Sequence, residues 1–377
     1  MPWRPSSFFR KGWALNSFDA FKDPALCRAL LDRLRAEATE PFRFMEVCGT
    51  HTVSIFQSGL RSLLPATITH VTGPGCPVCV THESEVACFL ELAGRDDVII
   101  ATFGDLMRVP GPKGKSLKTA QADGARIEVV YSPVDALAVA AANPGRTVVF
   151  LGVGFETTAP AVAATIRLAR EQQLTNFRVL CFHKLVPPAL HALLADPDIN
   201  IDAFILPGHV SAIIGAAPYA FLAERCGLPA VITGFEPLDI LSALLEIVAM
   251  RKSGQPAVVN AYTRVVADDG NPVARAVMDE VFMPVDALWR GLGLLPGSGL
   301  AIRPEFAAFD ALGLPGVALK ETPPLAGCRC GEVLKGKMAP NECPLFDKAC
   351  TPATPVGPCM VSTEGGCAAF YKYKLDL

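Results

Sequence analysis

Long apolar runs and runs of basic residues are both missing from this chain of 377 residues. No apolar stretch reaches about 18 residues without a charge, a proline or a polar break, so we expect no membrane span. Only 19% of the residues are charged and the net charge is −3, so we expect no nucleic-acid surface. With 51% hydrophobic residues, the chain can build a sizeable core, and its length allows two or three domains.

An export signal is also missing from the sequence. Residues 1–23 include basic residues but no continuous apolar segment and no small-residue cleavage site. We therefore expect no signal peptide and a cytoplasmic location. The chain nevertheless contains 13 cysteines. In a reducing compartment, cysteines are more often metal ligands or redox groups than structural disulfides.

Regular helical or strand periodicity is missing from the last fifty residues, which are rich in glycine, proline and threonine. Such a segment cannot bury enough surface to fold alone, so disulfides, zinc or an iron–sulfur cluster must hold it together. The cysteines available for this purpose are Cys328, Cys330, Cys343, Cys350, Cys359 and Cys367.

The spacing of these six cysteines favours an iron–sulfur cluster but leaves zinc and disulfides open. Structural zinc sites usually contain two close C-x2-4-C pairs, whereas the one tight pair here is Cys328 and Cys330. Widely spaced cysteines suit a cubane cluster, which four thiolates approach from four directions. One such set consists of Cys328, Cys343, Cys350 and Cys367. Cys330 and Cys359 are then left as a redox pair or local disulfide, although Cys328 and Cys330 could exchange roles.

Short apolar segments alternate with helical patterns through the middle of the chain. The expected strands are 43–47, 67–72, 97–103, 126–131, 147–153, 177–182, 202–206 and 229–233. This alternation predicts an α/β fold of two related, mainly parallel domains that face each other across a cleft. The expected units are a helical segment (1–42), α/β domain I (43–145), α/β domain II (146–245), a helical connection (246–320) and a small cysteine-rich domain (321–377).

Two cysteine motifs follow expected strands, at the edge where α/β proteins bind ligands. The motif Cys48-Gly-Thr-His51 carries a thiol and an imidazole, which form either a nucleophile with its base or two ligands for a metal such as iron. The motif Gly73-Pro-Gly-Cys76-Pro-Val-Cys79 places a C-x-x-C at a helix start, where thiolates are stabilised. It indicates a redox-active or metal-handling dithiol, the alternative being half of a zinc site.

Two further strand-end motifs contribute an acid and an imidazole. Glu156 follows Gly152-x-Gly154 and is a candidate ligand or acid–base group, or only a carboxylate in the first turn of a helix. A dinucleotide-binding loop would need glycine where Thr157 stands. His209, in PGHVS, is a candidate ligand or a loop residue. Four cysteines in other surroundings are expected in the core: Cys27, Cys88, Cys181 and Cys226.

Taken together, these motifs resemble the HypD family, the assembly factors for the iron centre of [NiFe] hydrogenases. The resemblance rests on CGTHT, GPGCPVC, GDLMRVPG, GFETTAP and PGHVS in family order, on the cysteine spacing of the tail and on its FYKYK ending. It covers nearly the whole chain. It implies two related α/β domains and a small third domain around a cleft.

The resemblance also implies roles for the cysteines. The residues that align with the ligands of a [4Fe-4S] cluster are Cys328, Cys343, Cys350 and Cys367. Cys330 and Cys359 align with a disulfide pair near the cluster. Cys76 and Cys79 align with a redox-active dithiol.

The implied function is the assembly of an Fe(CN)2CO unit. Cys48, with His51 close by, aligns with the site that holds iron as a transient cargo while cyanide and carbonyl ligands are added. The implied partners are a HypC-type chaperone, which contributes its N-terminal cysteine to the iron, and a HypE-type cyanide donor. The protein would be an assembly factor with redox activity. The alternatives are a stand-alone iron–sulfur or dithiol oxidoreductase acting on a small molecule, and a structural zinc protein acting as an interaction module.

Overall fold

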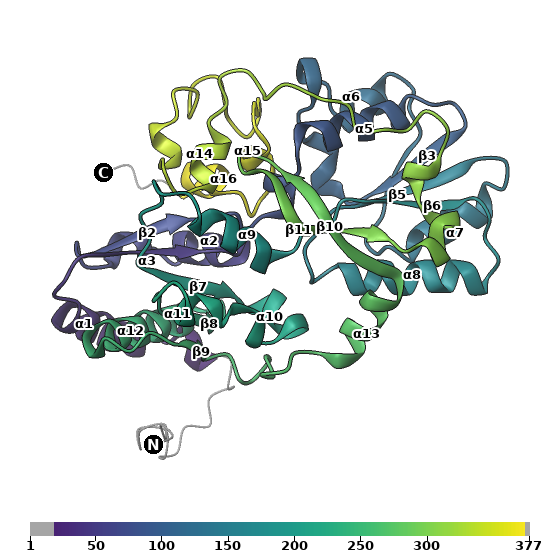
Figure 1. Ribbon diagram of the computed structural model, residues 1–377. Helices are drawn as coiled ribbons and strands as arrows, with labels where there is room; N and C mark the ends of the chain where they lie inside the picture. Colours follow the sequence, from purple (N-terminus) through teal and green to yellow (C-terminus); the bar gives the residue numbers. More distant parts are fainter. Residues whose placement is uncertain (1–18, 374–377) are drawn as a thin grey trace.

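The computed structural model describes residues 19–373 and contains two parallel β-sheets (Figure 1). The larger sheet has the strand order β2-β1-β7-β8-β9, and the smaller sheet has the order β4-β3-β5-β6. Two more strands, β10 and β11, form an antiparallel hairpin. The strands are β1 (Phe42–Glu46), β2 (Ile68–Thr72), β3 (Val98–Thr102), β4 (Ile127–Val129), β5 (Thr147–Gly152), β6 (Phe177–Cys181), β7 (Ala203–Pro207), β8 (Ala230–Thr233), β9 (Val258–Asn260), β10 (Phe282–Trp289) and β11 (Gly293–Ile302).

Helices cover both sheets. They are α1 (Pro24–Glu37), α2 (Gly49–Gln57), α3 (Leu60–Leu63), α4 (Pro77–Val80), α5 (Glu83–Ala93), α6 (Leu117–Ala122), α7 (Asp135–Ala142), α8 (Ala159–Glu171), α9 (Val186–Leu194), α10 (Gly208–Ile214), α11 (Phe221–Glu224), α12 (Pro237–Ser253), α13 (Pro272–Val281), α14 (Cys330–Leu334), α15 (Pro358–Val361) and α16 (Gly366–Lys372). In the described part of the chain, none of them is long and apolar enough to cross a membrane.

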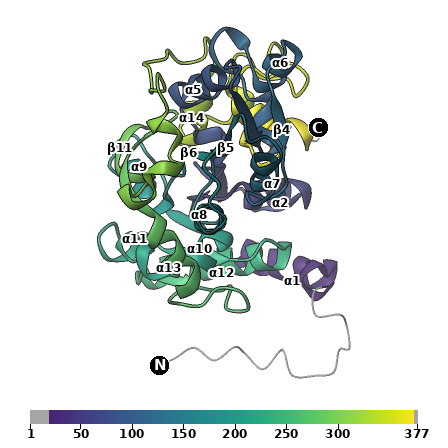
Figure 2. The same cartoon turned by 90° about the vertical axis from the view of Figure 1, so that its right-hand side faces the viewer.

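The mainly parallel α/β fold expected from the sequence is confirmed, and each of the eight expected strands is present. Every residue of β3, β7 and β8 is buried, as expected for strands of a parallel sheet that is covered on both faces. Helices α1 and α12 pack side by side on one face of the larger sheet (Figures 1 and 2). Helices α7 and α8 pack on one face of the smaller sheet.

Strands that are consecutive in the chain do not all belong to the same sheet. Strand β1 pairs with β7, as in the register Met45↔Phe204, and β3 pairs with β5, as in Ile99↔Val148. The expected division between residues 145 and 146 therefore does not separate the sheets, because the chain leaves the larger sheet after β2 and returns to it at β7. Most consecutive strands pair with each other, but β1 with β7 and β3 with β5 do not follow this rule, because parallel neighbours are joined by long crossover connections.

Residues 246–320 are not the helical connection that we expected from the sequence. Helix α13 leads directly into β10 and β11, whose turn contains Gly291 and Gly293 at φ 78° and 81°. Glycine adopts such positive φ values at little cost and allows the tight reversal. The hairpin lies between the two sheets (Figure 1), with bridges Thr81↔Trp289 and Lys184↔Gly299. It therefore joins the loop after β2 to the loop after β6.

The cysteine-rich C-terminal segment lies on the loops that follow β1 and β2 (Figure 1). Helix α16 packs on α2, where the rings of Phe56 and Phe370 are 4.6 Å apart and the Arg61 guanidinium lies 4.0 Å from the Phe370 ring. Helix α15 packs on α4. The segment that cannot fold alone is thus supported by the larger sheet and its loops.

Candidate functional site

The loops after β1 and β2 are in direct contact at the carboxyl edge of the larger sheet. Cys48 follows β1, is buried, and is the N-cap residue of α2. The Gly49 N–H donates a hydrogen bond to the Gly75 carbonyl oxygen at 2.9 Å. A Cβ atom on Gly75 would overlap the backbone of Cys48, so only glycine allows this approach. The two cysteine motifs predicted separately from the sequence are therefore parts of one site.

His51 lies on the first turn of α2 and is fully buried. Its Nε2 lies 2.9 Å from the Gly234 carbonyl oxygen, so Nε2 carries the proton and donates it. Its Nδ1 has no hydrogen-bond partner. Burial lowers the pKa of His51 to about 4, so the ring is neutral near pH 7. A neutral imidazole with a free Nδ1 lone pair is suited to act as a base or as a metal ligand.

His209 is brought to the same edge because β7, which it follows, pairs with β1. The ring of Phe235 lies 4.1 Å from the His209 ring and 4.5 Å from the His51 ring. His209 is exposed, so the site reaches the surface there. Partial desolvation lowers the pKa of His209, and the charge of Glu364 opposes this effect.

Glu364 is a site residue that the sequence analysis missed. The Thr50 hydroxyl donates a hydrogen bond to Glu364 Oε1 at 2.9 Å, and a Cβ atom on Gly49 would overlap the Glu364 side chain. Burial, followed by the charge of Glu364, raises the pKa of the Cys48 thiol to about 12. The one feature of the sequence that could have indicated Glu364 is its position directly before Gly365 and Gly366 in the cysteine-rich tail.

Glu46, the last residue of β1, was also missed and orients the loop that carries Cys48. Its Oε2 accepts a hydrogen bond from the Cys48 N–H at 3.1 Å, and its Oε1 accepts one from the Thr52 hydroxyl at 2.6 Å. His70 Nε2 lies 3.6 Å from Oε1. Glu46 is completely buried, and burial raises its pKa well above the usual range. From the sequence it was indistinguishable from an exposed residue on a strand.

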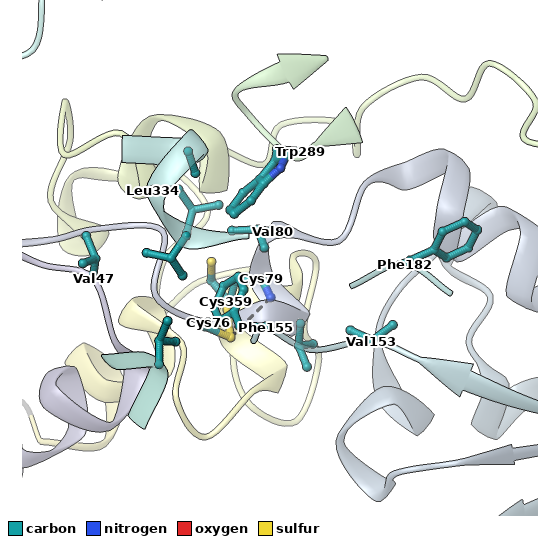
Figure 3. Close-up of a cluster of buried hydrophobic side chains, with 14 of the residues drawn as sticks. Val47, Cys76, Cys79, Val80, Val153, Phe155, Phe182, Trp289, Leu334 and Cys359 are labelled. Carbon is teal, nitrogen blue, oxygen red and sulfur yellow. Dashed lines mark hydrogen bonds between the residues drawn. A yellow bond between two sulfur atoms is a disulfide. The ribbon is translucent and has the colours of Figure 1, made fainter. Parts of the chain in front are cut away.

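Cys76 and Cys79 form a disulfide at the start of α4, with their Cα atoms 5.2 Å apart. It is the one disulfide among the described residues. Figure 3 shows this pair in one buried cluster with Cys359 of α15 and with Phe155 from the loop after β5. The Ser362 hydroxyl lies 3.2 Å from the Cys76 sulfur. The C-terminal segment therefore contacts the predicted dithiol directly.

The six cysteines of the C-terminal segment line one cavity. They are Cys328, Cys330, Cys343, Cys350, Cys359 and Cys367. Cys330 and Cys359 are free thiols here. Contacts with the sulfurs of Cys328 and Cys359 lower the pKa of Cys330, and Arg290 adds to this effect. All six predicted residues are thus brought together, but the structure does not divide them into ligands and a redox pair.

Two backbone features accommodate these thiols. A Cβ atom on Gly357 would overlap the sulfur of Cys328, and the Val356 N–H donates a hydrogen bond to the Cys350 sulfur at 3.3 Å. Across residues 19–373, no three His, Cys, Asp or Glu side chains are placed so that they could hold a single metal ion. The thiols are instead distributed around the cavity wall.

Glu156 approaches the site from the smaller sheet, in the loop after β5. Its Oε1 accepts a hydrogen bond from the Val186 N–H at 2.9 Å, and its Oε2 has no partner. The adjacent Phe155 packs in the same cluster as Val47 and Cys76 (Figure 3). The carboxyl edges of both sheets therefore meet around the two cysteine motifs. Burial raises the pKa of Glu156 to about 7.

Glu156→Gln is expected to make stability less dependent on pH. The raised pKa means that the folded state holds this proton more tightly than the unfolded state, so wild-type stability falls as the pH rises from about 4.5 to about 7. The variant has no carboxyl group at this position, so its stability should not fall in this way. Its free energy of unfolding should therefore increase relative to that of wild type by about 3 kcal/mol between acidic and mildly alkaline pH. Urea unfolding at several pH values measures this. A difference in unfolding free energy between variant and wild type that does not change with pH would contradict the prediction. The control is Glu171→Gln, which changes an exposed residue at the end of α8.

The other cysteines fulfil the core prediction in part. Cys88 and Cys181 are buried and Cys27 is half-buried. Cys226 is exposed, which corrects the prediction. It follows α11 and precedes Gly227, whose φ of 66° marks a turn. The apolar residues around Cys226 in the sequence belong to elements on either side of this turn, so they do not cover its side chain.

The fold and the site together define a class: an α/β protein of two parallel sheets in which strand-end loops and a C-terminal segment gather buried thiols around a Cys/His pair. The HypD family model, described as "Hydrogenase formation hypA family", matches residues 25–374. The chain therefore belongs to the HypD family, as the motifs indicated.

Curated relatives are similar over almost their whole length. HypD2 of Bradyrhizobium diazoefficiens, a hydrogenase maturation factor, is 46% identical over 367 residues, which cover 94% of this chain and 96% of that protein. The hydrogenase maturation factor HypD of Rhodobacter capsulatus is 47% identical over 368 residues, covering 94% and 97%. The factor of the same name from Escherichia coli is 44% identical over 364 residues, also covering 94% and 97%.

Proposed function

We propose that this protein is a cytoplasmic hydrogenase maturation factor that holds iron while cyanide and carbonyl ligands are added, forming Fe(CN)2CO. Membership of the HypD family and relatives named as hydrogenase maturation factors support the general role. The observation that carries the specific proposal is the position of Cys48 and His51 together at the start of α2. A buried thiol and an imidazole with a free Nδ1 lie on one helix turn, at an edge that reaches the surface at His209.

Thiolate and imidazole are donors that suit iron. In this proposal Cys48 binds the iron cargo through its sulfur, and His51 binds it through Nδ1. A HypC-type chaperone supplies a further cysteine, and a HypE-type protein delivers cyanide. Burial of the surrounding side chains keeps water away from the iron.

A [4Fe-4S] cluster in the C-terminal segment is part of the proposal. The four thiols that would hold it are those of Cys328, Cys343, Cys350 and Cys367. Each thiolate of such a cluster binds a different iron, which fits thiols distributed around one cavity. When bound, it would supply electrons.

The remaining thiols form a path from this cavity toward Cys48. Cys330 contacts Cys359, and α15, which carries Cys359, packs on α4, which has Cys76 as its N-cap and contains Cys79. A thiolate of the Cys330/Cys359 pair would attack the Cys76–Cys79 disulfide, forming a mixed disulfide and releasing one thiolate. Attack by the second thiol would complete the two-electron reduction of Cys76–Cys79 and leave Cys330–Cys359 oxidised.

The test is anaerobic purification together with the chaperone, followed by infrared and Mössbauer spectroscopy. We expect cyanide and carbonyl stretching bands from one iron species and a separate Mössbauer signal from the cluster. A colourless, iron-free preparation that is fully competent in hydrogenase maturation would contradict the proposal. Turnover of a small molecule without any protein partner would favour the oxidoreductase alternative instead.

A further inference from the structure

Three buried polar side chains between the two sheets have oxygen atoms without hydrogen-bond partners. They are Glu156 (2% exposed), Ser211 (0%) and Tyr219 (0%), and the atoms are Oε2, Oγ and the phenol oxygen. Leaving a buried polar group unpaired destabilises the folded state. Three such groups in one region destabilise the fold together. A small polar ligand that supplied the missing hydrogen-bond partners would remove this destabilisation.

These groups lie next to the site that contains Cys48. Ser211 is on α10, and Tyr219 ends the 3₁₀ helix Ala217–Tyr219 that follows α10. Helix α10 starts directly after β7, and β7 pairs with β1 up to Glu46↔Ile205. The Val47 N–H continues this ladder to the Ile205 carbonyl oxygen at 3.3 Å. The start of α10 therefore lies at the same edge as Cys48. Phe155, the neighbour of Glu156, packs in one buried cluster with Val210 of α10 and with Tyr219.

Tyr219 is the shared neighbour of the other groups. Burial raises the pKa of its phenol well above the usual range, the charges of Glu156 and Cys48 contribute to the rise, and Ser211 opposes it. The phenol therefore keeps its proton near neutral pH. Its oxygen has no hydrogen-bond partner at normal distance, although the Ser211 hydroxyl lies near enough to oppose the rise of its pKa.

We propose that the Tyr219 and Ser211 hydroxyls, with Glu156 beside them, form a subsite that donates hydrogen bonds to the nitrogen of a cyanide bound to iron at Cys48. Cyanide binds iron through carbon, so its nitrogen lone pair points outward and accepts hydrogen bonds, whereas the oxygen of bound carbon monoxide is a much weaker acceptor. The subsite would therefore hold a cyanide ligand and disfavour carbon monoxide at this position. The inference rests on the proposed function and specifies how its site distinguishes the two ligands.

The test compares Tyr219→Phe, Ser211→Ala and the double variant with wild type, each purified anaerobically in complex with the chaperone. Infrared spectra of samples made with ¹⁵N-labelled cyanide identify the cyanide bands. We expect at least one cyanide band to shift by more than its line width in each single variant, and further in the double variant. Tyr131→Phe, which removes a hydroxyl from a tyrosine that is 94% exposed, is the matched control and should leave every band in place.

The possible outcomes separate this inference from the function on which it rests. Cyanide bands that keep their wild-type positions in all three variants would overturn the subsite and leave the proposed function intact. Loss of a cyanide band from a variant with a wild-type circular dichroism spectrum would support the subsite. A wild-type complex without cyanide bands would overturn the proposed function itself. Since each variant lacks only a hydroxyl group, two independent variants are available should one fold poorly.

Discussion

Cys48→Ala is expected to abolish iron retention in the complex with the chaperone while leaving the C-terminal cluster in place. Cys48 is the thiol beside His51 and Glu364, at the end of the strand that leads into α2. Alanine offers no donor to iron, whereas the thiols around the C-terminal cavity are unchanged. The infrared cyanide and carbonyl bands should fall to background, and the visible absorption of the cluster should remain.

The matched control for this prediction is Cys88→Ala. Cys88 is also a buried free thiol, but it lies on α5 among apolar side chains. Its truncation should cost about 1 kcal/mol of stability and leave the cyanide-bearing iron unaffected. If the Cys48 variant still carried that iron by infrared spectroscopy, Cys48 could not be its protein ligand.

Cys343→Ala is expected to remove the visible absorption of the cluster and most of its iron and sulfide, while the two sheets stay folded. Cys343 lines the cavity of six thiols, and a cubane that loses one of four thiolates is no longer held on all sides. The cores that contain α1 with α12 and α7 with α8 include no residue of the C-terminal segment. The far-ultraviolet circular dichroism of the sheets should therefore change little.

The same measurement on neighbouring cysteines would assign the ligands. Cys226→Ala, on the surface, should leave the absorption unchanged and is the control. In the proposed arrangement one of Cys328 and Cys330 is a cluster ligand and the other belongs to the redox pair, so Cys328→Ala and Cys330→Ala should differ in their effect on the absorption. Retention of full cluster absorption by the Cys343 variant would remove Cys343 from that set.

Local patterns in the sequence were sufficient to predict eight strands of the two parallel sheets. Apolar runs such as Val98–Thr102 and Ala203–Pro207 are strands buried along their whole length, and a run of this composition has few other stable conformations. The hairpin from Phe282 to Ile302 was not predicted. The alternation of side chains along its first strand is interrupted by a bulge between Val285 and Ala287. The glycines of its turn are equally typical of a loop, so they did not indicate a hairpin.

The site could be predicted only in part. Cys48, His51, Cys76 and Cys79 stand out because thiols and imidazoles follow strands directly. Tyr219 and Ser211 carry no such signal, since a tyrosine or serine after a strand is usually a packing or capping residue. Only their complete burial without hydrogen-bond partners distinguishes them.

By itself, the sequence determined eight of the strands, the motifs at their carboxyl ends and the family, because these depend on residues close together along the chain. Only the tertiary structure decided which strands share a sheet and that Glu46 and Glu364 surround Cys48. It also placed Cys359 beside Cys76 and Cys79, almost three hundred residues away in sequence. Such contacts join distant segments through the packing of the whole chain, and no short stretch of residues encodes them.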